Sequence, residues 1–84
     1  MMVSILKIYK YEDRYFLDGF QLLEFGKEEL IKGKQEQLYE LPLSKILNFV
    51  VEFENLFGEQ MDIQYNEISE EYLTHVYNSN NKQY

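Results

Sequence analysis

The one histidine of the chain is the residue best suited to acid–base or metal chemistry. His75 follows Glu71 by four residues, a helical spacing at which the two side chains can share a metal ion or orient an imidazole. No third ligand stands at a clear spacing, and a Glu–His pair on a helix surface explains the spacing as well. A nucleophile–base–acid arrangement would need the same histidine, and cysteine and a glycine-rich phosphate loop are both lacking. We therefore predict no metal site, no cofactor and no enzymatic activity.

Acidic residues dominate the charge of the chain and are unevenly placed. Fifteen Asp and Glu oppose eight Lys and Arg, for a net charge of −7. No Lys or Arg occurs between Ile46 and Asn81, so the net charge belongs to the C-terminal half. A field of one sign attracts basic surfaces and repels nucleic acids and anionic lipids, which bind through Lys and Arg. We expect a basic protein surface as the partner, with no direct nucleic-acid and no membrane binding.

Binding to another protein is the function that these features favour. Carboxylates would stand where phosphates otherwise lie, so the chain would be a stoichiometric inhibitor that occupies a basic, nucleic-acid-binding surface of another protein. In composition it resembles small acidic phage and mobile-element inhibitors. Its eight tyrosines also suit a binding surface, because the ring packs while the hydroxyl stays wet. The predicted partner-binding residues are Glu52, Glu54, Glu59, Asp62, Glu67, Glu70, Glu71 and Tyr72.

Two N-terminal strands, Val3–Tyr11 and Arg14–Phe25, are predicted to pair as an antiparallel hairpin around a turn at residues 12–13. A two-residue turn there sets Tyr9 opposite Phe16, and it produces apolar and opposite-charge pairs along one face. The other face should be polar if it were solvated. It carries instead a smaller apolar patch of Leu6, Ile8, Tyr15 and Leu17.

The remaining elements follow from periodicity and from capping residues. Residues 26–34 are consistent with either a short helical turn or a second hairpin loop. The other predicted elements are a strand at Gln35–Leu41, a helix at Leu43–Phe57 between Pro42 and Gly58, a strand at Met61–Tyr65, and a helix at Glu70–Asn78 capped by Ser69.

The helix at Leu43–Phe57 carries more apolar residues than one buried side uses. Its polar strip is only about 100° wide, and apolar residues fill most of the remainder. The short C-terminal helix, a second copy of the chain or a target protein could cover the extra flank. Glu54 interrupts the apolar arc, where it either reaches water near a frayed end or pairs with a base of a partner. A second copy would make the chain a homodimeric structural or accessory protein, the alternative function.

These elements predict an α+β fold. A small antiparallel sheet, opened by the N-terminal hairpin, carries one main amphipathic helix, and a short C-terminal helix follows the last strand. Eighty-four residues make a single domain, 1–84, with a frayed polar tail at 78–84. The chain lacks cysteine, a signal-peptide pattern and an apolar run long enough to span a membrane. We expect a cytoplasmic protein.

Overall fold

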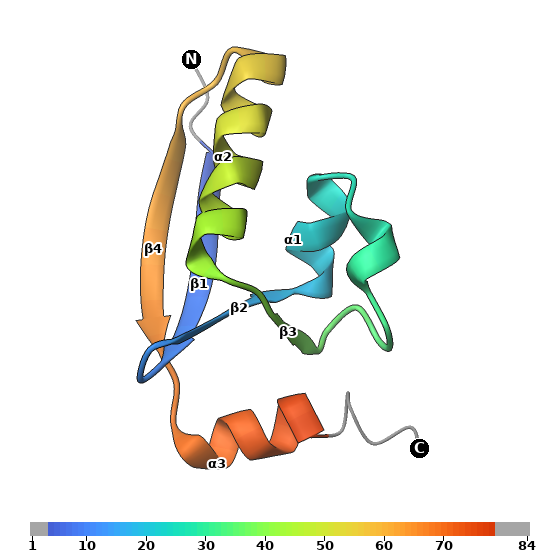
Figure 1. The fold of residues 1–84 in the computed structure, drawn as a ribbon, viewed down its shortest axis with the longest axis vertical. Coiled ribbons are helices and arrows are strands. Elements are labelled where there is room, and N and C mark those ends of the chain that lie inside the picture. Colours follow the sequence, from blue (N-terminus) through green and yellow to red (C-terminus); the bar gives the residue numbers. More distant parts are fainter. Residues whose placement is uncertain (1–3, 79–84) are drawn as a thin grey trace.

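The computed structural model describes residues 4–78, which form an α+β fold (Figure 1). Four strands make one mixed sheet in the order β3-β2-β1-β4, and the longest helix, α2, stands along it. Residues 79–84, most of the predicted frayed tail, lie outside the described part. The elements are β1 (Ser4–Tyr11), β2 (Arg14–Asp18), α1 (Gly19–Glu24), the 3₁₀ turn η1 (Glu28–Leu30), β3 (Leu38–Glu40), α2 (Leu43–Phe57), β4 (Met61–Glu67), α3 (Glu70–Leu73) and the π-helical turn η2 (Thr74–Asn78).

The N-terminal hairpin has the predicted register. Tyr9 lies opposite Phe16, and Tyr11 lies opposite Arg14. The two-residue turn begins at Glu12, whose φ of 54° is in the left-handed region. That region is uncommon for residues other than glycine, asparagine and aspartate, so Glu12 holds a conformation that its residue type does not favour. Cross-strand complementarity, rather than turn chemistry, identifies the hairpin.

The second strand is shorter than predicted, because it ends at Asp18 and helix α1 replaces the segment expected to continue to Phe25. The Asp18 side chain caps α1 by accepting the Gln21 N–H at 2.9 Å. The Gln21 side-chain amide then takes the place of the missing strand beside β1. Its Oε1 accepts the Lys7 N–H at 2.8 Å, and its Nε2 donates to the Lys7 carbonyl at 2.9 Å. The pairs predicted beyond residue 18 are therefore wrong.

The sheet is mixed: β1, β2 and β3 pair antiparallel as predicted, and only the pairing of β4 departs from the predicted antiparallel arrangement. β4 runs parallel to β1, with Ser4 beside Met61 and Lys10 beside Glu67. The cause is α2, whose fifteen residues return the chain by about 22 Å along the length of β1. The chain therefore enters β4 beside the start of β1. The strand also runs two residues beyond the predicted end.

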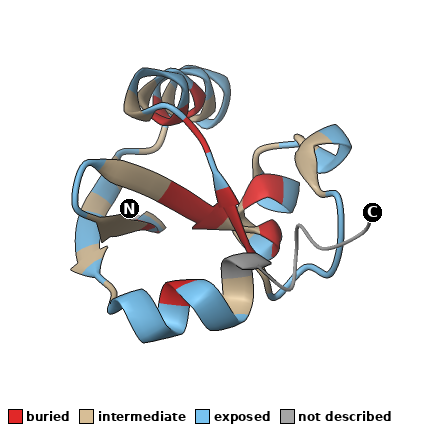
Figure 2. Cartoon of the chain, turned by 60° about the horizontal axis from the view of Figure 1, so that its bottom comes forward, coloured by how far each residue is buried: buried red, intermediate tan, exposed pale blue. Residues whose placement is uncertain are grey.

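Both faces of the sheet are covered at the end that holds β2 and β3, with α2 on one side and α3 on the other (Figure 2). The larger core lies under α2, where the hairpin residues Leu6, Ile8 and Leu17 are buried with Ile46 and Val50. The face that looked like the smaller apolar patch is therefore the main packing face. The opposite face holds a second cluster of Phe16, Leu38 and Leu73.

Helix α1 and the chain after it, rather than the C-terminal helix, cover one flank of α2. The Phe25 ring lies 5.6 Å from that of Phe49 and 5.9 Å from that of Phe53. The C-terminal helix packs on the far face of the sheet instead, through Leu73. The C-terminal helix was one of the three candidates that the sequence suggested to cover this flank, and that candidate is wrong. Helix α1 was not among them. Val51, Leu56 and Phe57 stay exposed on α2.

The predicted ends of the two later helices are confirmed in detail. Gly58 follows α2 in the left-handed conformation, with φ 68°. The Ser69 hydroxyl accepts the Tyr72 N–H at 3.1 Å and so caps α3. The segment 26–34 contains the short helical turn η1. The C-terminal helix is α-helical only to Leu73 and widens into η2 beyond it.

Candidate protein-binding surfaces

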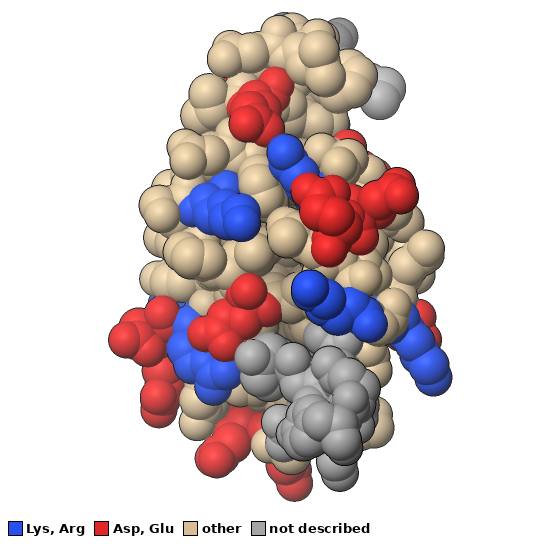
Figure 3. All heavy atoms as spheres, turned by 45° about the vertical axis from the view of Figure 1, so that its right-hand side comes forward, with Lys and Arg blue, Asp and Glu red and all other residues tan. Residues whose placement is uncertain are grey.

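Carboxylates from three segments of the chain meet at one end of the molecule. The hairpin turn lies there beside the end of β4 and the first turn of α3 (Figure 1). Figure 3 shows acidic side chains gathered at the same lower end. We call this region the acidic end, and it consists of Glu12, Asp13, Glu67, Glu70 and Glu71, all exposed.

Lys10 ties two of these segments together. Its backbone carbonyl accepts the Ile68 N–H at 2.9 Å, which holds the chain after β4 against β1. Its ammonium donates to the Glu12 carbonyl oxygen and lies 3.8 Å from Glu67 Oε2. The Glu67 side chain is nevertheless 81% exposed, so this ion pair is a weak, solvated one. One lysine therefore orders the acidic end without neutralising it.

The titration of Tyr11 reports how closely the acids gather. Partial withdrawal of the ring from water raises the pKa of Tyr11 above its ordinary value of 10.0, and the Glu12 and Glu70 carboxylates raise it further. Arg14 acts in the opposite direction. Acids from the hairpin turn and from α3 thus act on one tyrosine, although they are far apart in the sequence.

The structure brings only part of the predicted acidic set together. Glu67, Glu70 and Glu71 belong to the acidic end, and Tyr72, 44% exposed, follows them on α3. Asp62 lies apart from them near the start of β4, where it is exposed. Glu52 lies on the opposite side of α2, where Oε1 is 3.5 Å from the Lys27 ammonium.

Glu54 and Glu59 make contacts within the chain. Glu54 Oε2 accepts the Met61 N–H at 2.9 Å, and the Glu59 side chain accepts from the Ser4 hydroxyl at 3.4 Å. Both side chains are half-buried. Glu54 therefore stabilises the turn from α2 into β4, a role that neither reading from the sequence included. Its predicted contact with a partner is untested, as is that of Glu59.

An apolar groove lies between the end of α1 and the second half of α2. It has a volume of about 290 Å³, and phenylalanine rings from both segments line it. Phe53 and Phe57 pack there with their rings tilted by 45° and their centroids 4.7 Å apart. Glu24 and Glu52 stand among its lining residues, and Lys27 lies beside it, 5.1 Å from the Phe49 ring.

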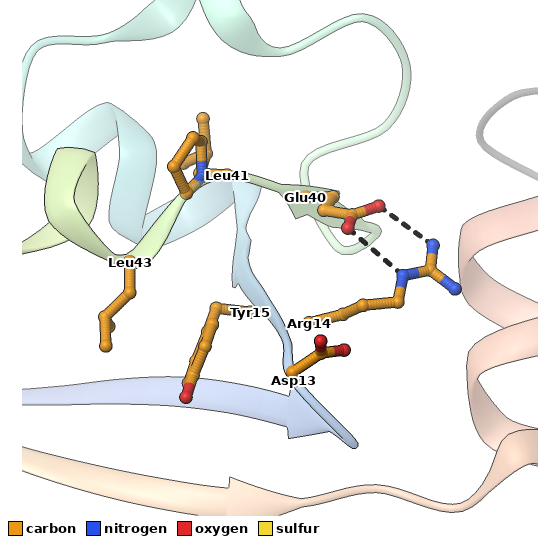
Figure 4. A pocket seen from close by; sticks show the side chains of 7 residues that line it. Asp13, Arg14, Tyr15, Glu40, Leu41 and Leu43 are labelled. Atoms are coloured by element: carbon orange, nitrogen blue, oxygen red, sulfur yellow. Dashed lines mark hydrogen bonds and ion pairs between the residues drawn. The ribbon is translucent and has the colours of Figure 1, made fainter.

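A second, more polar depression of about 480 Å³ lies where β2 and β3 meet the start of α2. Figure 4 shows the Arg14 guanidinium and the Glu40 carboxylate facing each other on one side, with Tyr15 and Leu43 on the other. Two parallel hydrogen bonds, of 3.1 Å and 2.8 Å, join the two charged groups. This bidentate pair fastens β2 to β3.

The Glu71–His75 pair lies at the surface, where both residues are exposed. The helix changes from α to π geometry between them, at Thr74. Among residues 4–78, no three His, Asp or Glu side chains gather as a metal site would require. Within the same range, no helix is long and apolar enough to cross a membrane.

Comparison with family models, with curated proteins and with solved structures found no match to this chain. The candidate binding surfaces are therefore assigned from the geometry and charge of this chain alone. Sequence reasoning missed Glu12 and Asp13 because they lie more than fifty positions from Glu67. The predicted hairpin was the available signal, since its turn had to project from one end of the sheet beside whichever strand joined it.

Proposed function

We propose that this protein binds another protein without catalysis, as an inhibitor that occupies a basic, nucleic-acid-binding surface of its partner. The acidic end makes the contact. The observation that supports this is the presence of five exposed carboxylates at one end of the molecule, on the hairpin turn, at the end of β4 and in the first turn of α3 (Figure 1). Two of them, Glu12 and Glu70, act on Tyr11. Carboxylates presented beside tyrosine rings suit a basic surface that otherwise holds phosphates.

The placement of the charges favours this surface over the rest of the acidic set. The α3 acids lie in the first turn of their helix and form no ion pair with any of residues 4–78, and Glu67 is largely solvated despite Lys10. Such exposed charges steer association and fix orientation more than they add affinity. They are screened within about 8–10 Å at physiological ionic strength, so binding must weaken as salt is added.

The test is a comparison of three immobilised proteins exposed to the same cell lysate. The first is the wild type, and the second is the variant E67Q/E70Q/E71Q. The third is E24Q/E28Q/E29Q, a control that also removes three negative charges, but from α1 and η1, where the side chains are likewise exposed. We expect one retained nucleic-acid-binding protein that the wild type and the control hold and that the acidic-end variant loses.

Elution distinguishes nucleic-acid mimicry from other binding. Double-stranded DNA or RNA added to the loaded resin should displace the retained protein, because both ligands need the same basic surface. A protein that stays bound in the presence of excess nucleic acid contradicts mimicry. A protein held equally by the wild type and E67Q/E70Q/E71Q contradicts the role of the acidic end.

A further inference from the structure

Strand β4 forms a long edge of the sheet. Among residues 4–78 its one strand neighbour is β1, and Figure 1 shows it at the outer left side of the molecule. An edge strand presents a row of backbone donors and acceptors that can pair with another chain. Natural edges are usually blunted by lysine, proline, a bulge or shortness, whereas this strand has seven residues, MDIQYNE, with no lysine or proline. The edge is therefore open to a further strand.

The sequence of β4 complements itself when a second copy runs antiparallel to it. With a twofold axis through Gln64, Ile63 lies opposite Tyr65 of the other copy, and Asp62 lies opposite Asn66. Met61 then lies opposite Glu67, and the two Gln64 amides meet. All seven residues are paired. Because the Ile68 N–H donates to the Lys10 carbonyl oxygen, the backbone groups of residues 61, 63, 65 and 67 point outward. Glu54 already accepts the Met61 N–H, so about six backbone hydrogen bonds can form between the two copies.

Neighbouring registers are worse. Opposite residues of an antiparallel pair must share a face, so the axis can move only by a whole residue. Moving it to Ile63 sets Glu67 opposite Glu59 of the other copy, and moving it to Tyr65 sets Ile63 opposite Glu67. Both shifts separate Ile63 from Tyr65, and they place like charges or an apolar–charged pair in its stead. The register centred on Gln64 keeps Ile63 opposite Tyr65, and its own apolar–charged pair, Met61 with Glu67, lies at the ends of the strand.

Apolar surface lies beside this edge, on the face that carries α2. Ile63 and Tyr65 point to that face, since they pair with the buried residues Leu6 and Ile8. Tyr65 touches Tyr15 in its own chain and yet is 51% exposed. A second β4 would cover it with Ile63 of the other copy.

The flank of α2 that faces β4 continues the apolar surface. Residues 47, 51 and 54 form one ridge of the helix, and Glu54 of this ridge bonds the first residue of β4. Val51 is 53% exposed on the same ridge. A twofold axis perpendicular to the sheet brings this ridge toward the same ridge of the second copy. Part of the apolar arc left uncovered by α1 then faces protein rather than water.

The charges permit this pairing in spite of the net charge of each copy. Asp62 lies two positions from the axis, so the two Asp62 side chains are about 13 Å apart, beyond the screening length. The two Glu67 residues are farther apart still. We infer that the protein forms a homodimer through antiparallel β4–β4 pairing centred on Gln64, which joins two sheets into one. The dimer surface and the acidic end share only Glu67, the last residue of β4, whereas the other four residues of the acidic end lie outside the paired strands. The inference can therefore be tested separately from the proposed function.

Sedimentation of the full chain over about 1 to 100 μM tests the inference. The wild type should be dimeric within this range. Tyr65→Lys should raise the dissociation constant by about 100-fold or more, because each dimer would bury two unpaired ammonium groups. Tyr72→Lys is the matched control, an identical change at a half-exposed tyrosine on α3, and should leave the dissociation constant unchanged. A wild type that is monomeric at the highest concentration overturns the inference, as does a dimer that Tyr65→Lys leaves intact.

Single cysteines locate the axis, because the natural chain has none. Residues directly opposite in an antiparallel pair have Cα atoms about 4.5–5.5 Å apart, within the range of a disulfide. Mild oxidation should therefore crosslink Gln64→Cys into a covalent dimer much faster than Asp62→Cys, whose partners are about 13 Å apart. Equal rates for the two variants, or faster crosslinking of Asp62→Cys, contradict the register. Circular dichroism of each variant confirms that it is folded.

Discussion

Leu73 attaches α3 to the far face of the sheet, and its removal measures how much that attachment stabilises the fold. The side chain is 5% exposed and packs in the cluster with Phe16 and Leu38, both almost fully buried. Leu73→Ala removes the transfer free energy of the deleted atoms and leaves a cavity beneath the helix. A buried Leu→Ala change lowers the free energy of unfolding by about 2–5 kcal/mol. Because this cluster is small, we expect a loss at the lower end of that range, about 2–3 kcal/mol.

Thermal and urea unfolding followed by circular dichroism measure this loss. For a domain of this size, about 2–3 kcal/mol corresponds to a fall in Tm of about 8–24 °C. Leu56→Ala is the control, because it makes the same chemical change on α2 at a side chain that is 76% exposed. It should change the free energy of unfolding by less than about 0.5 kcal/mol. If the two variants are equally stable, α3 does not pack against the sheet as described.

Three further predictions concern local features. Gly19→Ala should lower the free energy of unfolding by more than about 2 kcal/mol in a urea titration, because the new Cβ would stand 2.6 Å from the Gln35 carbonyl oxygen. Glu54→Gln should lower it by about 1 kcal/mol, because a charged acceptor of a backbone N–H becomes neutral, whereas Glu52→Gln should have almost no effect. Stability should fall as the pH rises above about 10, since Tyr11 keeps its proton in the folded state at a pH where the unfolded chain loses it.

Each of these has an outcome that contradicts it. A Gly19→Ala protein as stable as the wild type would mean that the chain around Gln35 yields easily. Equal effects of Glu54→Gln and Glu52→Gln would remove the special role of Glu54. For Tyr11, absorbance titration of the phenolate should show a lower pKa in Glu70→Gln than in the wild type, because a carboxylate that raises it is gone. An unchanged pKa of Tyr11 would mean that Glu70 on α3 does not lie close enough to the hairpin turn to act on it.

The sequence predicted the local elements better than their directions. The hairpin register followed from cross-strand pairs alone, and the ends of α2 and α3 followed from Gly58 and Ser69. The alternation in β4 predicted a half-buried strand, but alternation has no direction, so it did not distinguish parallel from antiparallel pairing. That choice depended on α2, which returns the chain to the start of β1.

The end of β2 was missed for a different reason. Apolar residues continue from Phe16 to Phe25, and their pattern fits a strand as well as a short helix. The distinguishing signal was the spacing of Asp18 and Gln21, an N-cap and a residue three positions on. A signal this short is outweighed when the strand interpretation already pairs well. The same error concealed α1, and with it the cover for one flank of α2.

The two proposed surfaces respond to salt in opposite directions. Screening weakens the attraction between the acidic end and a basic partner, but it reduces the repulsion between two copies that each carry a net charge of −7. Added salt should therefore tighten the dimer and loosen the complex. Measuring both equilibria in one set of buffers separates a failure of the β4 interface from a failure of the acidic end.

The most direct test of the proposed function is the salt dependence of the affinity for the partner that the immobilised protein retains. For the wild type and for E24Q/E28Q/E29Q, the affinity should fall by about tenfold or more between about 50 and 200 mM salt. For E67Q/E70Q/E71Q it should be weaker at low salt and change less with salt, because the carboxylates that respond to screening are gone. An affinity that is indifferent to salt, and equal for the wild type and the acidic-end variant, would contradict binding through the acidic end.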